Sequence, residues 1–323
     1  MRFFVTGGAG FIGSHVTDRL LALGHEVVVY DNFSTGREEF LEDARRSSRA
    51  TLVRGDTLDL DGLRNAMAGC EFVIHLAANA DVRFGSLNPR RDFEQNTLAT
   101  FHVLDAMRLG GIQQIAFAST GSVYGEASVF PTPEDAPFPI QTSFYAASKL
   151  ACEGLVEAYS EAYGFRSFIF RFVSILGERY THGHVYDFVK SLRADPAALR
   201  VLGNGRQRKS YLYVHDCISA MLTAFEQAPS RLNILNLGTD EYCEVNDSIR
   251  WITERIGVTP QLEYTGGERG WVGDSPFIFL DCARVRALGW RPELSIREGV
   301  VRTVEYLQSH PWMLESRIPG SES

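Results

Sequence analysis

A glycine-rich turn near the N-terminus constrains the fold more than any other feature of the sequence. The apolar residues 2–6 predict a buried strand, and residues 13–23 have the spacing of an amphipathic helix. The turn between them fits G-x-x-G-x-x-G through Gly7, Gly10 and Gly13, and it also fits G-x-G-x-x-G. A strand that passes through such a turn into a helix is typical of the first unit of a doubly wound sheet.

Strand-like and helical segments alternate along the rest of the chain. Apolar runs follow at 26–30, 51–54, 72–77, 114–119 and 166–172, with helical patterns at 59–68, 90–109 and 144–163. This alternation predicts an α/β fold with a doubly wound parallel sheet, the Rossmann fold. After Phe172 the pattern loosens, and 211–214, 215–227 and 232–237 predict a return to the sheet. We therefore expect a first domain from 1–172 plus about 211–239, a second, smaller α/β lobe from about 173–210 plus 240–310, and a frayed tail at 311–323.

The composition excludes several classes of protein. The chain has 45% hydrophobic and 22% charged residues, which is typical of globular proteins. Its net charge of −8 argues against a large basic surface that binds nucleic acid. The five cysteines form no C-x-x-C pair, so we expect no disulfide framework, no metal site and a reduced, cytoplasmic setting. No run approaches the ~18 apolar residues that cross a membrane, and we expect no signal peptide.

The glycine turn and the acid that follows it indicate a dinucleotide site. Glycines let backbone N–H groups reach a pyrophosphate at the helix N-terminus. Asp31 ends the second predicted strand, where its carboxylate would accept from a ribose 2′-hydroxyl and repel a 2′-phosphate. The sequence therefore predicts NAD over NADP. Asp56 and the small residues after His75 end two other strands, where either close approach of the cofactor or plain packing would explain them.

Tyr145 and Lys149 are the candidate catalytic pair. Residues four apart on a helix lie on one face, so a phenol and an ammonium are neighbours here. A free phenol has a pKa near 10, and lowering it by ~3 units takes about 4 kcal/mol. We expect the Lys149 ammonium and a positively charged nicotinamide to supply this, leaving a base poised near working pH. Thr120 ends the strand before this helix and would hold a substrate hydroxyl, or else bond its own backbone.

Three other signals favour structural roles. Tyr186 and Lys190 repeat the Tyr-x-x-x-Lys spacing, but no hydroxyl-bearing strand end precedes them, so we interpret them as one face of an amphipathic helix. His182 and His184 lack an evident third ligand and are interpreted as loop residues. Cys152, next to the catalytic turn, is interpreted as packing.

These motifs together resemble a known family. The set TGGAGFIG at 6–13, Asp31-Asn32, HLAA at 75–78, Ser119-Thr120 with Val123-Tyr124-Gly125, and YAASK at 145–149 resembles the extended short-chain dehydrogenase/reductase family. Within it the chain is most similar to NAD-dependent nucleotide-sugar epimerases of the UDP-glucose 4-epimerase type. The resemblance covers nearly the whole chain.

The resemblance implies a mechanism and a set of site residues. Tyr145 would remove the sugar 4-hydroxyl proton while hydride passes from C4 to NAD, the 4-keto sugar would rotate, and hydride would return to its other face. Lys149 would acidify Tyr145 and bind the nicotinamide ribose, and Thr120 would orient O4. The implied cofactor contacts are Gly7, Gly10, Phe11, Ile12, Gly13, Asp31, Asn32, Asp56, Thr57, Leu76, Ala77, Ala78, Asn96, Tyr145 and Lys149.

The implied substrate site departs from the family pattern. Ser174 stands where asparagine is usual, and Lys209 where an arginine for the diphosphate is usual. Arg208 is expected to share that task, with Arg269 as the second diphosphate arginine. A UDP-hexose is the expected substrate, and a homodimer through helices at about 92–109 and 145–163 is the expected assembly.

Three functions remain open at this point. The dehydratases of the family carry Asp-Glu after the strand-end threonine and the uronate decarboxylases a glutamate, whereas this chain has Gly121 and Ser122, which favours simple epimerisation. A dehydratase, decarboxylase or ketoreductase is the alternative on the same fold. A non-catalytic dinucleotide sensor is the alternative of another class, disfavoured because Thr120, Tyr145 and Lys149 are all present.

Overall fold

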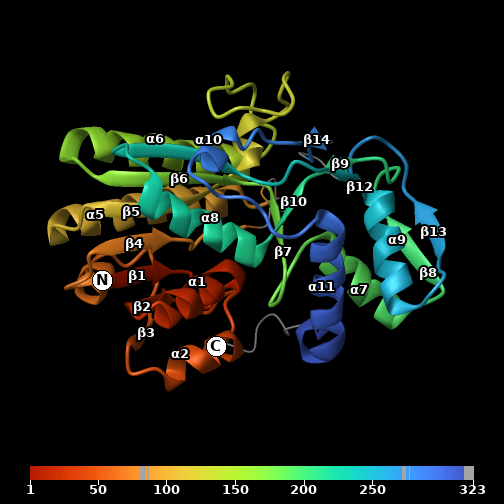
Figure 1. Cartoon of the computed structure of the whole chain (residues 1–323), viewed down its shortest axis with the longest axis horizontal. Helices are drawn as coiled ribbons and strands as arrows, with labels where there is room; N and C mark the ends of the chain where they lie inside the picture. Colours follow the sequence, from red (N-terminus) through yellow and green to blue (C-terminus); the bar gives the residue numbers. More distant parts are fainter. Residues whose placement is uncertain (81–84, 86, 271–273, 276, 316–323) are drawn as a thin grey trace.

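The computed structural model describes residues 1–80, 85, 87–270, 274, 275 and 277–315, and a seven-stranded parallel sheet lies at its centre (Figure 1). The strand order is β11-β6-β5-β4-β1-β2-β3. The strands span Arg2–Thr6 (β1), Glu26–Asp31 (β2), Ala50–Arg54 (β3), Phe72–His75 (β4), Gln114–Thr120 (β5), Arg166–Phe172 (β6) and Leu232–Leu237 (β11). The order reverses between β1 and β4, so the predicted doubly wound sheet is confirmed. A ligand crevice is expected at that reversal.

Helices cover both faces of this sheet because successive strand residues point to opposite sides. Val5 and Val29 face one apolar core, which includes α1 (Phe11–Ala22) and α8 (Val214–Gln227). Phe4 and Val28 face a second core, with α3 (Leu60–Met67), α5 (Ala99–Gly110) and α6 (Phe144–Tyr163). The strands are apolar on both sides for this reason.

The helix that carries the predicted catalytic pair has well-defined ends. Ser143 caps α6, with its Oγ accepting from the Ala146 N–H at 3.1 Å, and Gly164 ends it with a φ of 72°. The segment before α5 is also helical, as α4 (Pro89–Asp92) followed by a π-helical stretch, Phe93–Leu98. The sequence predicted both helical regions to within one residue at each end.

A second group of elements lies beside the large sheet, at the right of Figure 1. It contains α7 (His184–Ala194), α9 (Val245–Ile256) and α11 (Ile296–Ser309). Short strands pair within it: β8 (Ala198–Val201) with β13 (Gln261–Tyr264), and β9 (Arg208–Lys209) with β12 (Cys243–Glu244) and β14 (Phe277–Ile278). The remaining short elements are Glu38–Leu41, α2 (Glu42–Arg46), Gly121–Tyr124, α10 (Ala283–Ala287) and Pro311–Leu314.

Two predictions about the second half of the chain need correction. Residues 211–214 were expected to rejoin the central sheet, but β10 (Tyr211–Tyr213) pairs with β7 (Ser174–Leu176) in a separate two-stranded sheet. The tail was expected to fray after His310, but Met313 is fully buried and its carbonyl accepts from the Tyr186 hydroxyl at 2.7 Å. Arg37 also stacks on Trp312, so apolar contacts hold residues 311–315 in place. Residues 316–323 lie outside the described residues.

Among the helices that the structure describes, none combines the length and apolar character that a membrane-crossing segment needs.

Candidate active site

The glycine turn is closed so tightly that side chains would not fit. Gly7 has a φ of 67°, and its carbonyl accepts from the Gly10 N–H at 3.0 Å. A Cβ on Gly13 would lie 2.1 Å from the Gly7 oxygen, and one on Gly7 would lie 2.7 Å from the Ala77 nitrogen. The turn therefore lies against the end of β4 with bare backbone, which is what the predicted dinucleotide motif requires.

The N-terminus of α1 offers donors for an anion. An α-helix leaves its first N–H groups without intrahelical acceptors, and Phe11, Ile12 and Gly13 occupy that first turn. The turn contains no acidic residue, and Gly10 precedes it without a side-chain cap. Backbone donors at the positive end of the helix dipole suit a pyrophosphate. The residues present thus fit the NAD that the sequence predicts.

Asp31 is held at the end of β2 by the backbone around it. Its Oδ2 accepts from the Ala9 N–H at 2.9 Å and its Oδ1 from the Phe33 N–H at 2.8 Å, and the side chain is buried. These bonds place a carboxylate beside the glycine turn, at the strand end where the sequence predicts a ribose contact.

The ends of β2 and β3 meet next to a cavity. Asn32 donates from Nδ2 to Asp56 Oδ2 at 3.0 Å, and Asp56 Oδ1 accepts from the Leu58 N–H at 2.9 Å; Thr57 between them is buried. A cavity of about 270 Å³ opens beside Asn32. Its lining includes Ser34, Thr35, Ala78 and Asn79 on the sheet side and Arg90 and Arg91 on the helical side.

The end of β4 is fixed from two directions. Thr6 Oγ1 accepts from the N–H groups of Leu76 and Ala77, each at 3.2 Å. Asn96, fully buried, accepts from the Asn79 N–H at 2.8 Å and donates to the Ser148 hydroxyl at 2.9 Å. Asn96 therefore connects the end of β4 to the catalytic helix.

The three predicted catalytic residues come together at the carboxyl edge of the sheet. Thr120 ends β5, and its hydroxyl lies close enough to the Tyr145 phenol to lower the pKa of that phenol. Lys149 is buried one turn along α6 and donates from Nζ to the Ala118 carbonyl at 2.8 Å. Its Nζ also lies 4.8 Å from the centre of the Phe117 ring. Helix α6 therefore packs against the end of β5 through Lys149, one turn after Tyr145.

The acidity of Tyr145 differs from the sequence expectation. Burial raises the pKa of the phenol to about 12, and only the hydrogen bond from Thr120 opposes this. Burial also lowers the pKa of Lys149, whose ammonium is engaged by the Ala118 carbonyl. In the chain by itself Lys149 is not among the groups that lower the pKa of Tyr145. The predicted acidification by Lys149 and a bound nicotinamide together stays a prediction.

The fold and this arrangement agree with comparisons to known proteins. Residues 3–238 match the NAD dependent epimerase/dehydratase family. This chain belongs to that NAD-dependent epimerase/dehydratase family. It is 33% identical to the UDP-glucose 4-epimerase of Mycolicibacterium smegmatis, over 96% of this chain and 99% of the relative.

Solved structures give the same picture. The UDP-glucose 4-epimerase of Thermotoga maritima, solved with UDP-glucose, is 31% identical with a TM-score of 0.86, over 96% of this chain and 100% of that one. The UDP-glucose 4-epimerase of Thermus thermophilus, solved with NAD, is 32% identical with a TM-score of 0.83, over 95% of this chain and 99% of that one. Membership in the epimerase/dehydratase family, the fold and the NAD dependence that the family name states thus agree with the sequence predictions.

Lys209 and Arg269, the two cations predicted to bind the substrate diphosphate, each form an ion pair with a carboxylate. Lys209 Nζ lies 2.7 Å from Asp274 Oδ1 and also contacts the Ser275 carbonyl. Arg269 pairs with Glu126, and both side chains are largely exposed. Both cations lie near the segment Gly121–Tyr124. Ser275, which contacts Lys209, donates to the Gly125 carbonyl at 3.3 Å, and Glu126, which pairs with Arg269, is the next residue.

Arg208 and Lys209 are not brought together. They are successive residues of β9 and therefore point to opposite sides of it. Arg208 stacks on Phe277, 4.0 Å from the ring centre, and on Tyr242. Ser174 is exposed at the start of β7.

The second Tyr-x-x-x-Lys pair and Cys152 have the structural settings that were expected. Tyr186 and Lys190 lie on helix α7, with Tyr186 buried. His182 lies in a loop as predicted, but the loop prediction for His184 is wrong: it is the first residue of α7, where its ring nitrogens hydrogen-bond Ser248 and Tyr211. Cys152 is fully buried and donates to the Asn96 carbonyl at 3.4 Å.

The sequence analysis missed a buried polar group behind the catalytic residues. Glu153 follows Lys149 by four positions on α6 and forms an ion pair with Arg171 of β6. The four-residue spacing was a usable signal, since it places Glu153 on the face of Lys149. Nothing in the sequence pattern identified Arg171 as its partner.

Proposed function

We propose that this chain is an NAD-dependent epimerase that inverts C4 of a UDP-hexose. The observation that carries this proposal is that Thr120, Tyr145 and Lys149 lie together at the carboxyl edge of the sheet, the edge at which the glycine turn also lies. Family membership and the UDP-glucose 4-epimerases to which the chain is similar support the same reaction.

The chain's own residues would handle the proton of the sugar hydroxyl. The Thr120 hydroxyl lies beside the Tyr145 phenol and would hold the substrate O4 there. The Tyr145 oxygen would take the O4 proton and later return it. Lys149, anchored on the Ala118 carbonyl, would contribute a fixed positive charge near the phenol and bind the nicotinamide ribose. When bound, NAD supplies the hydride acceptor and donor for C4.

The proposed cofactor contacts follow the geometry already described. Phe11, Ile12 and Gly13 suit the pyrophosphate, and Asp31 and Asn32 suit the adenosine ribose. Asn32 and Ala78 line the same cavity, and Asp56, with Thr57 next to it, is hydrogen-bonded to Asn32. This supports cofactor contacts from Asp56, Thr57 and Ala78. Asn96 would act by holding the end of β4 against α6.

Gly121 supports epimerisation over dehydration. A Cβ on Gly121 would lie 3.2 Å from Leu280 and 3.3 Å from Ile278, tighter than ordinary contact. An acidic side chain at this position, as in the dehydratases, would have to displace both residues. Ser122 is engaged with Thr120, accepting its hydroxyl at 3.2 Å. Neither position offers a carboxyl group to move a proton at C5 or C6.

Lys209 and Arg269 are the proposed diphosphate contacts, with Ser174 and Arg208 at the edge of the same site. Both cations are already paired with carboxylates, so substrate would compete with Asp274 and Glu126. The exposed Arg269 pair would exchange more readily, because surface ion pairs contribute little. We assign residues 1–172 plus about 211–239 to the NAD lobe and about 173–210 plus 240–310 to the sugar-nucleotide lobe.

We also propose a homodimer and a cytoplasmic location. Helices α5 and α6 pack side by side and expose large apolar side chains, among them Phe101, Leu109 and Phe144. Burying these against a second copy would form a helical interface. The five cysteines are all free thiols, which supports a reducing compartment.

The test is to incubate the purified protein with UDP-, GDP-, CDP- and dTDP-hexoses and identify the products by mass and NMR. A product of equal mass with inverted C4 is expected from a UDP-hexose. Loss of water or carbon dioxide would indicate the dehydratase or decarboxylase alternative. NAD binding without turnover would indicate the sensor.

Tyr145→Phe should lower turnover by about 10²- to 10⁴-fold, the range for removal of a general acid–base group. Tyr186→Phe is the matched control, because it removes the phenol of the second Tyr-x-x-x-Lys pair and should leave turnover unchanged. Retained activity in Tyr145→Phe would remove the phenol from the reaction.

A further inference from the structure

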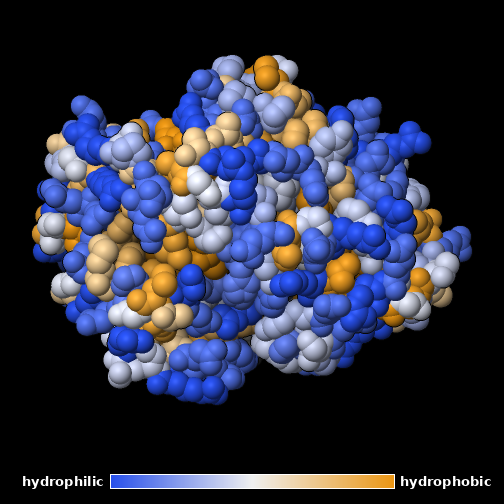
Figure 2. Space-filling model, viewed as in Figure 1, coloured by the Kyte–Doolittle hydropathy of each residue, from blue (hydrophilic) through white to orange (hydrophobic). Residues whose placement is uncertain are grey.

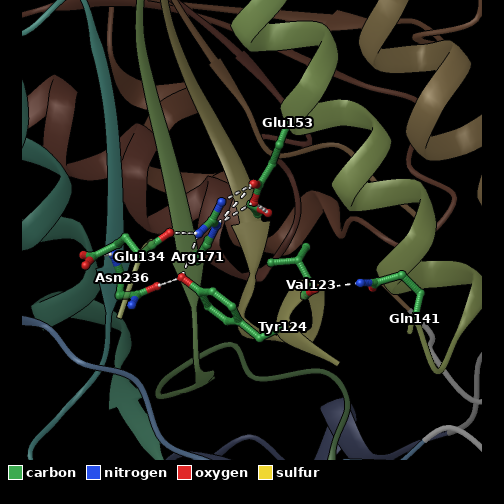
Figure 3. A network of polar contacts seen from close by, with 8 residues as sticks. Val123, Tyr124, Glu134, Gln141, Glu153, Arg171 and Asn236 are labelled. Atoms are coloured by element: carbon green, nitrogen blue, oxygen red, sulfur yellow. Dashed lines mark hydrogen bonds and ion pairs between the residues drawn. The ribbon is translucent and has the colours of Figure 1, made fainter. Parts of the chain in front are cut away.

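One fully buried guanidinium lies directly behind the catalytic residues. Arg171 lies on β6 opposite Ser119 of β5, so it is one residue away from the strand end that carries Thr120. Its side chain is 2% exposed and its partner Glu153 is 1% exposed. Arg171 donates to both Glu153 oxygens, with Nε at 3.0 and 3.2 Å and Nη2 at 2.7 Å (Figure 3).

Glu153 in turn connects the catalytic helix to the catalytic strand. It lies one turn beyond Lys149 on α6 and accepts a hydrogen bond from the Ser119 hydroxyl. Lys149 donates to the carbonyl of Ala118, the preceding residue. Two successive turns of α6 are therefore fixed to two successive residues of β5. The same two elements carry Tyr145 and Thr120.

The other side of Arg171 holds the segment that follows Thr120. Nη1 donates to the Tyr124 hydroxyl at 2.7 Å and to the Glu134 carbonyl at 2.8 Å. The Tyr124 hydroxyl donates to Asn236 at the end of β11, at 2.8 Å. Figure 3 shows Arg171 in the middle of these groups, with Glu153 reaching down from the helix and Tyr124 and Asn236 on the opposite side.

We propose that the Arg171–Glu153 pair is a positioning unit for the reaction. It fixes the separation of Tyr145 and Lys149 on α6 from Thr120 on β5, without itself touching substrate. The proposal rests on the proposed function, in which these three residues act on one hydroxyl. Its physical reason is the bidentate, two-sided geometry: a planar guanidinium can bond a carboxylate on one edge and two oxygens on the other, which no lysine or apolar residue reproduces.

Stability alone does not account for this pair. A buried ion pair loses the hydration of both charges, and replacement of such pairs by apolar residues of similar volume is often neutral or stabilising. Removing one partner is different, because it leaves a buried charge without compensation. Replacement of both partners by apolar residues therefore tests the positioning role with little expected loss of stability, whereas removal of one partner affects stability as well.

The decisive variant is the double substitution Glu153→Leu with Arg171→Met. We expect it to fold, with a thermal midpoint close to that of the wild type, and to bind NAD. We expect kcat for the C4 inversion to fall by about 10- to 100-fold with KM nearly unchanged, since misplacement by about 1 Å can cost 10²-fold. Unchanged kcat in a folded double variant would overturn the proposal. If this variant fails to fold, Ser119→Ala replaces it: it removes the Ser119 bond to Glu153 and leaves the ion pair, and it should lower kcat several-fold.

The matched control joins the same helix to the same strand at the far end. Ser160 of α6 and Ser167 of β6 are buried and share a hydrogen bond of 2.5 Å. The variant Ser160→Ala with Ser167→Ala removes that contact and should leave kcat unchanged. A fall in kcat equal to that of the Glu153→Leu, Arg171→Met variant would mean that any polar loss between α6 and β6 affects turnover, which would contradict a specific positioning role.

A pH profile adds a readout that a purely structural role would not move. The titratable groups that act on Lys149 or are acted on by it are Cys152 and Glu153 on its own helix and His75 on β4, and Arg171 is paired with Glu153. Glu153 helps to keep the lysine charged, so Glu153→Gln lowers the pKa of Lys149 further. The alkaline limb of the kcat profile should therefore move to lower pH in Glu153→Gln, and an unmoved limb would count against the proposal.

These outcomes are distinguishable from failure of the proposed function. If the wild type dehydrates or decarboxylates a nucleotide sugar, the epimerase proposal fails, but the same variants still report on hydride transfer in that reaction. If the wild type inverts C4 and the folded double variant does so at the same rate, only the positioning proposal fails.

Discussion

The two proposed sides of the active site are built in different ways. On the proposed cofactor side, backbone groups of one continuous strand–turn–helix unit come together, and Gly7 and Gly13 leave no room for side chains. On the proposed sugar-nucleotide side, the cations Lys209 and Arg269 are engaged by Asp274 and Glu126, which come from distant parts of the chain. The space-filling view shows a largely hydrophilic surface over the second group of elements and more apolar side chains over the part with the large sheet (Figure 2).

The difference shows which kind of site a sequence can disclose. A site made of local backbone geometry is fully described by the spacing of a few glycines. A site made of charges depends on which carboxylate each cation meets, and that is decided by the fold. The predictions below test whether the cofactor side is rigid and the sugar side exchangeable, in order of decreasing effect.

Gly13→Ala should damage the cofactor side most. Its Cβ would lie 2.1 Å from the Gly7 oxygen, so we expect a loss of about 3 kcal/mol or more in the free energy of unfolding. NAD binding should also be lost, measured by cofactor content and titration. Gly299→Ala is the control, because it lies in the first turns of α11 with its nearest neighbour at 3.9 Å. It should gain up to about 1 kcal/mol. Equal effects of both variants would contradict a rigid turn.

Acid should destabilise both sides through histidines whose pKa the fold lowers, among them His75 on one side and His184 on the other. Burial, assisted by Lys149 for His75 and by Lys209 for His184, lowers the pKa of each histidine to about 3. Above pH ~6.5 both are neutral in the folded and unfolded states and contribute nothing. Below pH ~6.5 each histidine binds a proton in the unfolded chain and stays neutral in the folded chain. The free energy of unfolding therefore falls by up to ~1.4 kcal/mol per pH unit for each histidine.

The measurement is urea unfolding of the wild type, His75→Asn and His184→Asn at several pH values between about 4 and 7. Each substitution should flatten the pH dependence by a similar amount. A slope changed by His75→Asn and not by His184→Asn would show that the second region already opens in mild acid.

Most of the fold and the catalytic residues follow from the sequence, for identifiable reasons. Helix α6 was predicted at its observed bounds because Ser143 caps it and Gly164 ends it. The sequence predicted Thr120, Tyr145 and Lys149 to lie together because the carboxyl ends of parallel strands, and the helices that follow them, meet at one edge of the sheet. Burial raises the pKa of Tyr145 in the chain by itself, so the acidification predicted for the NAD-bound state stays a prediction.

Long-range pairs account for what the sequence did not disclose. Arg171 and Glu153 meet because β6 lies beside β5, which no local pattern states. Residues 211–213 pair with β7 outside the central sheet. Residues 311–315 pack because Met313 is buried and its carbonyl accepts from the Tyr186 hydroxyl.

Arg269→Gln should weaken substrate binding on the sugar side and have little effect on the fold. We expect KM for the UDP-hexose to rise about tenfold, equivalent to ~1.4 kcal/mol, with kcat and the thermal midpoint nearly unchanged. Steady-state kinetics across substrate concentrations would check this. Arg255→Gln is the control, since Arg255 forms a similarly exposed pair with Glu305 between α9 and α11. An unchanged KM would exclude Arg269 from the diphosphate site.

Glu126→Gln should have the smallest effect, in the opposite direction. It removes the carboxylate that competes with substrate for Arg269, so KM should fall about two- to threefold, because an exposed ion pair contributes only ~0–1 kcal/mol. The same assay checks it, and the double variant Glu126→Gln with Arg269→Gln should show no such fall. A higher KM in Glu126→Gln would mean that the carboxylate helps to bind substrate.

The central claim is that one hydrogen leaves C4 of the sugar and returns to the same carbon beside Tyr145. The most direct measurement supplies UDP-hexose deuterated at C4 and follows the label by NMR in the product. The account predicts an inverted C4 that keeps its deuterium, with no exchange into water, and no such product from Tyr145→Phe. Inverted product carrying ordinary hydrogen at C4 would contradict it.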